Sequence, residues 1–138
     1  MTALDTNVLI ALWDHDPAVH RPVRQSLDRE LRRGGLVVSA PVFAELRAGP
    51  GRSDAFLDTF CADTGIEVDW GFPEAVWRSA GEAFQRQVAS RASGRPRRLL
   101  ADCLIGAHAA HRCGRLLTLD PDGFRRAFPA LELPPVED

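Results

Sequence analysis

Residues 3–12 read ALDTNVLIAL, and this stretch places one carboxylate, Asp5, between a short apolar start and a longer apolar run. A charged side chain inside an apolar segment must be solvated, paired or bound to a cation, because burying it alone is costly. The short start predicts a strand over 2–5, and the longer run predicts a helix over 7–13. How the fold accommodates Asp5 should therefore indicate what the protein does.

Short apolar strands alternate with helices along the rest of the chain. We predict further strands over 36–39, 66–68 and 115–119 with a last edge strand over 131–133, helices over 18–33, 42–47, 53–63, 73–92 and 99–113, and a loop over 92–98. This alternation predicts an α/β fold, in which a mainly parallel central sheet is covered by helices on both faces. We expect residues 1–138 to form a single domain.

The composition excludes several classes of function. The net charge is −2, and all 17 basic residues are arginines. Without lysine, the chain has neither a P-loop of the G-K-[ST] type nor Schiff-base chemistry. No apolar run approaches the length that a membrane helix needs, so we expect a cytoplasmic protein. Three cysteines without a C-x-x-C pair are expected to be reduced.

Four acids are placed by this pattern near strand ends or on helices that follow strands. Asp5 and Asp120 come after predicted strands, Glu45 lies about one helical turn beyond another, and Asp102 lies on the most apolar helix. In α/β folds, ligands bind beyond the carboxyl ends of the strands. Alternative roles exist: Asp5 as a helix cap, Glu45 as an exposed helix residue, and Asp120 as the start of an Asp-Pro turn.

A shared location for these acids has a chemical consequence. Carboxylates that are gathered without lysine repel one another unless a cation neutralises them. Hard oxygen ligands suit Mg²⁺ or Mn²⁺, which keep positions open for water and phosphate oxygens. Such ions activate water and stabilise charge during phosphoryl transfer. The sequence therefore predicts a metal site at the strand ends.

Four segments, in this order and at these separations, resemble the PIN-domain family, and in particular the VapC-type toxins of bacterial toxin–antitoxin pairs. The segments are ALDTNVLIAL, VFAELRAG, LLADCLIGAHA and LLTLDPDGF. The resemblance implies a three-layer α/β/α sandwich and a metal-dependent endoribonuclease that hydrolyses RNA with a metal-activated water. It also implies a homodimer, and inhibition by a VapB-type antitoxin whose tail covers the acidic groove.

Individual residues are carried over from the family by the same matching. Asp5, Glu45 and Asp102 would hold Mg²⁺ or Mn²⁺, and Asp120 would be a more variable fourth acid. Thr6 and Asn7 would shape the turn after the first strand, and Thr118 would position a ligand or water. Asp122, in the same LDPDG segment as Asp120, is left open as a supporting residue.

Other interpretations remain open at this point. A haloacid-dehalogenase-like phosphatase would need D-x-D-x-T and usually a lysine, whereas Asn7 stands at the third position and no lysine exists. A PIN-like binding or regulatory protein with little or no nuclease activity is the other alternative. His108 and His111 share a helix face, but two helix histidines without further ligands favour a structural role over zinc binding. Asp63 and Asp69 match no motif, and we expect surface or capping roles for them.

Overall fold

A computed structural model describes residues 1–89 and 100–137. Its elements are β1 (Thr2–Leu4), α1 (Thr6–Leu12), α2 (Pro17–Gly34), β2 (Leu36–Ser39), α3 (Ala40–Arg47), α4 (Asp54–Thr64), β3 (Glu67–Asp69), α5 (Glu74–Ala89), α6 (Leu100–Arg112), β4 (Leu116–Leu117) and α7 (Pro121–Ala127). Strands and helices alternate along much of this order, as the apolar pattern predicts.

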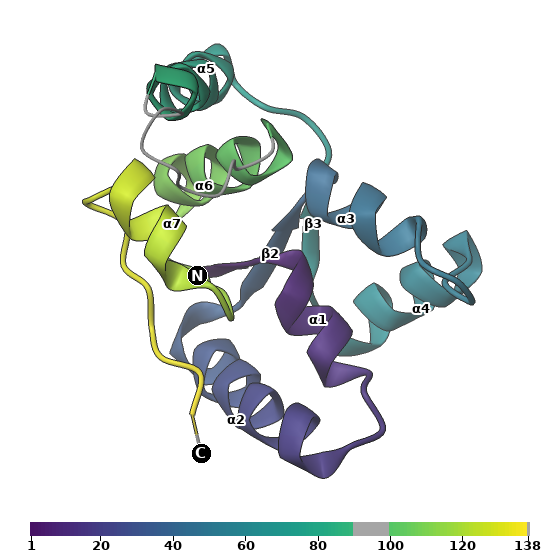
Figure 1. The fold of residues 1–138 in the computed structure, drawn as a ribbon. Coiled ribbons are helices and arrows are strands. Elements are labelled where there is room, and N and C mark those ends of the chain that lie inside the picture. Colours follow the sequence, from purple (N-terminus) through teal and green to yellow (C-terminus); the bar gives the residue numbers. More distant parts are fainter. Residues whose placement is uncertain (90–99, 138) are drawn as a thin grey trace.

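The four strands form one parallel sheet in the order β3-β2-β1-β4. Strand β1 is central: Ala3 is in register with Val37 of β2 on one side and with Leu116 of β4 on the other. Helices α1 and α2 lie on one side of the sheet, and α5 and α6 lie on the other (Figure 1). The predicted three-layer α/β/α arrangement with a parallel sheet is confirmed.

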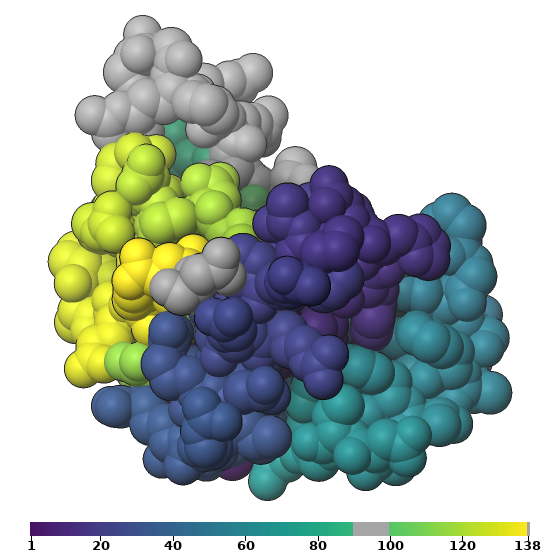
Figure 2. All heavy atoms as spheres, turned by 90° about the horizontal axis from the view of Figure 1, so that it is seen from below, coloured from purple at the N-terminus to yellow at the C-terminus, as the bar shows by residue number. Residues whose placement is uncertain are grey.

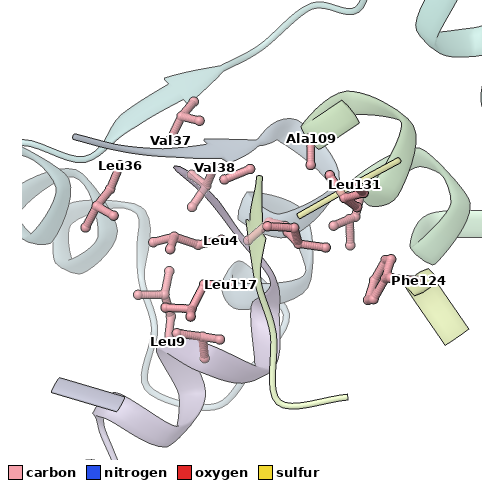
Figure 3. Packing of buried hydrophobic residues seen from close by; sticks show 14 of the residues in the cluster. Leu4, Leu9, Leu36, Val37, Val38, Ala109, Leu117, Phe124 and Leu131 are labelled. Carbon is pink, nitrogen blue, oxygen red and sulfur yellow. The ribbon is translucent and has the colours of Figure 1, made fainter. Parts of the chain in front are cut away.

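The core explains why the strands contain so few polar residues. Leu4, Val37 and Leu117 are at most 1% exposed, as expected for strands that helices cover on both faces. Leu9 of α1 and Ala109 of α6 pack with this group from the neighbouring helices (Figure 3). Helices therefore pack against both faces of the sheet.

The C-terminal part of the chain differs from the prediction in two places. Residues 121–127 form helix α7, where the sequence LDPDG suggested only a turn, because Asp-Pro also begins helices. The predicted edge strand over 131–133 is wrong: only an isolated bridge joins Glu132 to Arg115. The predicted loop over 92–98, like the last residues of the helix predicted over 73–92, lies outside the described residues.

A buried ionic network fastens the amino edge of the sheet. The carboxylate of Glu30 on α2 is fully buried and accepts hydrogen bonds from Arg115 Nε (2.6 Å), Thr2 Oγ1 (2.8 Å) and Arg29 Nε (2.9 Å). Arg29 also donates to the carbonyl oxygen of Pro135 (3.0 Å). Figure 2 shows the C-terminal segment lying along α2, where this contact holds it.

A second polar contact joins α6 to the edge strand β3. His108 is 3% exposed, and its Nε2 lies 2.7 Å from Asp69 Oδ2. The His108 ring also stacks on Phe72, with ring centroids 5.4 Å apart. Asp69 is therefore a partner of a core histidine and not only a surface residue.

The three cysteines are free, and no helix in the described part of the chain is long and apolar enough to cross a membrane.

Replacing Gly106 with Ala is expected to destabilise the protein by about 1–3 kcal/mol through overpacking. A Cβ atom at this position of α6 would clash with Phe128 Cε2 and lie 3.1 Å from Phe124 Cδ1. Gly81→Ala in α5 is the matched control, because a Cβ there meets nothing within 4 Å. The control should raise stability by about 0.5–1 kcal/mol. Chemical denaturation measures both, and equal effects of the two substitutions would contradict the close packing at Gly106.

Candidate functional site

One cavity of about 550 Å³ lies at the carboxyl edge of the sheet, where β1 and β4 end. Its size falls within the usual range of ligand sites. The lining brings together residues that are far apart in the sequence: Asp5, Thr6, Asn7, Ile10, Glu45, Asp102, Asp120, Asp122, Gly123, Phe124 and Arg126. All four predicted acids are in this group, so the fold brings them to one place. Their chemical role stays a prediction.

Asp5 is the most constrained of the acids. It follows β1 directly, is 7% exposed, and caps α1 by accepting a hydrogen bond from the Thr6 backbone N–H at 2.8 Å. Its second carboxylate oxygen accepts from Thr118 Oγ1, also at 2.8 Å. The capping role and a place in the cavity are compatible, because a carboxylate has about four acceptor sites and these two hydrogen bonds occupy only one on each oxygen.

The predicted supporting residues connect the walls of the cavity. Thr6 Oγ1 donates to Glu45 Oε1 at 2.7 Å, which links α1 to α3. Asn7 Oδ1 accepts from the Leu119 backbone N–H at 3.2 Å, and Thr118 Oγ1 accepts from the Asp120 backbone N–H at 3.1 Å. Thr118 does not line the cavity itself. It acts through Asp5, which its hydroxyl holds in one orientation.

The other acids enter the cavity from three helix regions. Glu45 is an exposed residue of α3, and Asp102 lies half-buried in the first turn of α6. Asp120 stands at the N-cap of α7, but its side chain makes no capping hydrogen bond. Its carboxylate is therefore not used to cap the start of the helix. Asp122 lines the cavity as well and pairs with Arg125 at 2.9 Å.

The carboxylates of Asp102 and Glu45 repel the carboxylate of Asp5 in this arrangement. Burial raises the pKa of Asp5 above its ordinary value, the hydrogen bonds from Thr118 and Thr6 oppose that shift, and the charges of Asp102 and Glu45 add to it. Among the residues that the structure describes, five carboxylates and one arginine line the cavity. The site would therefore gain stability from a bound cation.

The donor set fits a hard divalent ion. In the ranges 1–89 and 100–137, no three His, Cys, Asp or Glu side chains are close enough together to hold a metal ion as they stand. Mg²⁺, however, retains several waters and needs only one or two carboxylates directly. Asp5, Glu45 and Asp102 would hold such an ion, in part through water, and its charge would draw them together.

The sequence interpretation missed the contribution of α7. Arg126 and Phe124 line the cavity because this helix runs beside it. The available signal was the Asp-Pro pair at 120–121, which begins a helix as readily as a turn. Recognising the helix would have placed Asp122 and Arg126 one turn apart on the same face.

Fold and cavity together define an α/β domain with an acidic site at the carboxyl edge of a parallel sheet. The sequence profile of the PIN domain matches residues 2–128. The chain belongs to the PIN domain family, whose members are generally nucleases and typically use divalent metal ions.

Similar folds occur among solved structures. A chain of VapBC2 from Rickettsia felis bound to a promoter DNA fragment has a TM-score of 0.67 and 24% identity, and the match covers 96% of each chain. A chain of FitAcB from Neisseria gonorrhoeae has a TM-score of 0.63 and 22% identity, again with 96% of each chain covered. A chain of FitAB bound to the IR36 DNA fragment has a TM-score of 0.62 and 21% identity, covering 96% of this chain and 93% of that one. No curated protein matches the sequence.

Proposed function

We propose that the protein is a Mg²⁺- or Mn²⁺-dependent endoribonuclease that hydrolyses RNA phosphodiester bonds. The gathering of Asp5, Glu45, Asp102 and Asp120 in one cavity of a PIN domain carries this proposal. A divalent ion held there would supply an activated water and neutralise charge on the phosphate. The chain's own residues fix the carboxylates: Thr118 orients Asp5, and Thr6 orients Glu45.

We further propose that this nuclease is the toxin of a type II toxin–antitoxin pair. The support is the similarity of its fold to chains of the VapBC2 and FitAB complexes. A VapB-type antitoxin would then cover the acidic cavity, and the toxin would be a homodimer in the cytoplasm. Growth arrest on induced expression, relieved by the antitoxin, tests this role. A catalytically inactive Asp102→Asn variant should not arrest growth.

A PIN-fold binding or regulatory protein with weak nuclease activity is the second candidate. The observation that favours it is the absence of a ready-made metal cluster in the described part of the chain. A nuclease of this kind needs the ion, so failure of the isolated protein to bind Mn²⁺ would favour the second candidate. Cleavage of RNA then decides between them.

Removal of the metal is expected to abolish RNA cleavage. Purified protein incubated with labelled RNA should cut it with Mg²⁺ or Mn²⁺, stop on addition of EDTA, and resume when excess Mn²⁺ is restored. Asp102→Asn, purified identically, should remain inactive throughout. Asp63→Asn is the matched control, since Asp63 is exposed on α4 and does not line the cavity. Cleavage by Asp102→Asn at the wild-type rate would point to a contaminating ribonuclease and against the proposal.

A further inference from the structure

Arg126 is the basic residue among the described residues that line the acidic cavity. It is exposed near the end of α7, and it takes part in none of the ion pairs found within 4.0 Å in the described part of the chain. An arginine beside several carboxylates would be expected to pair with one of them. Its availability therefore needs a physical reason.

The helix itself supplies that reason. The carboxylate one turn before Arg126 is Asp122, at the i−4 position, where acidic and basic side chains normally meet. Arg125 holds this carboxylate instead, with Nη1 2.9 Å from Asp122 Oδ1. Asp5 and Glu45 are engaged by Thr118 and Thr6. Asp122, Asp5 and Glu45 thus have other hydrogen-bond partners, and Arg126, which lines the same cavity, forms an ion pair with none of the described acids.

A phosphodiester would need such a cation. The described residues place five carboxylates around the cavity, so one divalent ion does not balance their charge, and they would repel an approaching phosphate. Arginine binds phosphate through two parallel N–H donors and stays charged at every physiological pH. A phosphate held by Arg126 would lie beside α7, in the cavity that Asp5 and Glu45 also line.

We propose that Arg126 forms a phosphate-binding subsite for single-stranded RNA, beside the acidic residues. This inference rests on the proposed nuclease function and names a substrate contact for it. The subsite binds the RNA backbone without reading its bases, because a guanidinium on phosphate carries no sequence information. Arg126 is thus a binding residue, and hydrolysis is left to the carboxylates.

Binding of a fluorescein-labelled single-stranded RNA, followed by anisotropy in Mg²⁺, tests the subsite. The Asp102→Asn background prevents cleavage during the measurement. Adding Arg126→Ala should weaken binding about tenfold or more, since hydrogen bonds to charged groups are strong. It should also make the slope of log K against log salt shallower by about 0.7, the value for one phosphate contact on a single strand. Arg126→Lys should keep the salt slope but recover only part of the affinity.

Arg78→Ala is the control for the loss of one positive charge. Arg78 lies on α5, is largely exposed and pairs only with Glu74 at 3.2 Å among the described residues. It lies outside the cavity lining, so its removal should change neither the affinity nor the salt slope. In the active protein, Arg126→Ala should raise KM by the factor lost in binding and leave kcat nearly unchanged.

Each other outcome has a definite meaning. Unchanged affinity and salt slope in Arg126→Ala, with cleavage by the wild-type protein intact, would overturn the subsite and leave the nuclease proposal standing. A fall in kcat without a change in KM or in RNA binding would also overturn it, because Arg126 would then act only in the chemical step. Failure of the wild-type protein to bind or cleave any RNA would overturn both proposals.

Discussion

Replacing Asp5 with Asn is expected to reduce metal-dependent RNA cleavage by at least about a hundredfold, because even residues that only support metal ligands contribute about 10- to 100-fold. Asp5 is buried and lines the cavity, and the charges of Asp102 and Glu45 act on it. Asn has nearly the same shape but lacks the negative charge that a divalent ion needs. Cleavage rates of RNA in Mn²⁺ measure the loss.

The same substitution should not destabilise the metal-free protein at neutral pH. Burial raises the pKa of Asp5, so the charged form of this carboxylate is less favourable in the folded state than in the unfolded chain. An Asn side chain removes that cost and can still accept the hydrogen bond from the Thr6 backbone N–H. Denaturant unfolding in EDTA is expected to show a free energy of unfolding equal to or above that of the wild-type protein. Loss of cleavage together with marked destabilisation would mean that Asp5 is a structural cap and nothing more.

Replacing Arg115 with Ala is expected to cost about 3–5 kcal/mol of stability, the range for breaking a buried ion pair. Arg115 is mostly buried and donates two hydrogen bonds to Glu30, which has no contact with solvent. Its removal leaves a buried carboxylate with only Thr2 and Arg29 as partners. Arg78→Ala, which breaks an exposed pair, should cost under about 1 kcal/mol. Equal losses for the two variants would show that Glu30 is not buried in solution.

This network also predicts how stability depends on pH. Burial raises the pKa of Glu30, but the hydrogen bonds from Arg115, Thr2 and Arg29 outweigh burial and lower the pKa from 4.5 to about 2. A lowered pKa in the folded state stabilises the protein fully above the unfolded value. The stabilisation is lost as the pH falls from about 4.5 through 2. The difference in free energy of unfolding between wild type and Glu30→Gln should therefore shrink on acidification, and a difference that is the same at neutral pH and near pH 3 would contradict the network.

The sequence predicted the parallel sheet and the meeting of the four acids for the same physical reason. Apolar strands without alternation must be covered on both faces, and the carboxyl ends of parallel strands share one edge. Asp5, Glu45 and Asp120 follow such strands, so their convergence follows from chain order alone. Their placement in one cavity agrees with that reasoning, whereas metal binding stays a prediction.

Contacts between distant residues were beyond sequence reasoning. Glu30 lies at the end of an arginine-rich helix, where acidic residues are usually solvated, and its main partner is 85 positions away. The pairing of His108 with Asp69 spans 39 positions and links two elements that show no shared pattern. Helix α7 was missed for a local reason, since LDPDG suits a turn and a helix start equally. Arg126 was missed with it.

The central place of β1 in the sheet governs when the cavity becomes complete. Thr118, which holds Asp5, is 113 positions later in the chain, and β4 reaches β1 only after both of the other strands have been made. A growing polypeptide on the ribosome therefore carries Asp5, Glu45 and finally Asp102 without the strand and the hydroxyl that complete their surroundings. The surroundings of Asp5 can therefore be complete only once synthesis has passed residue 118.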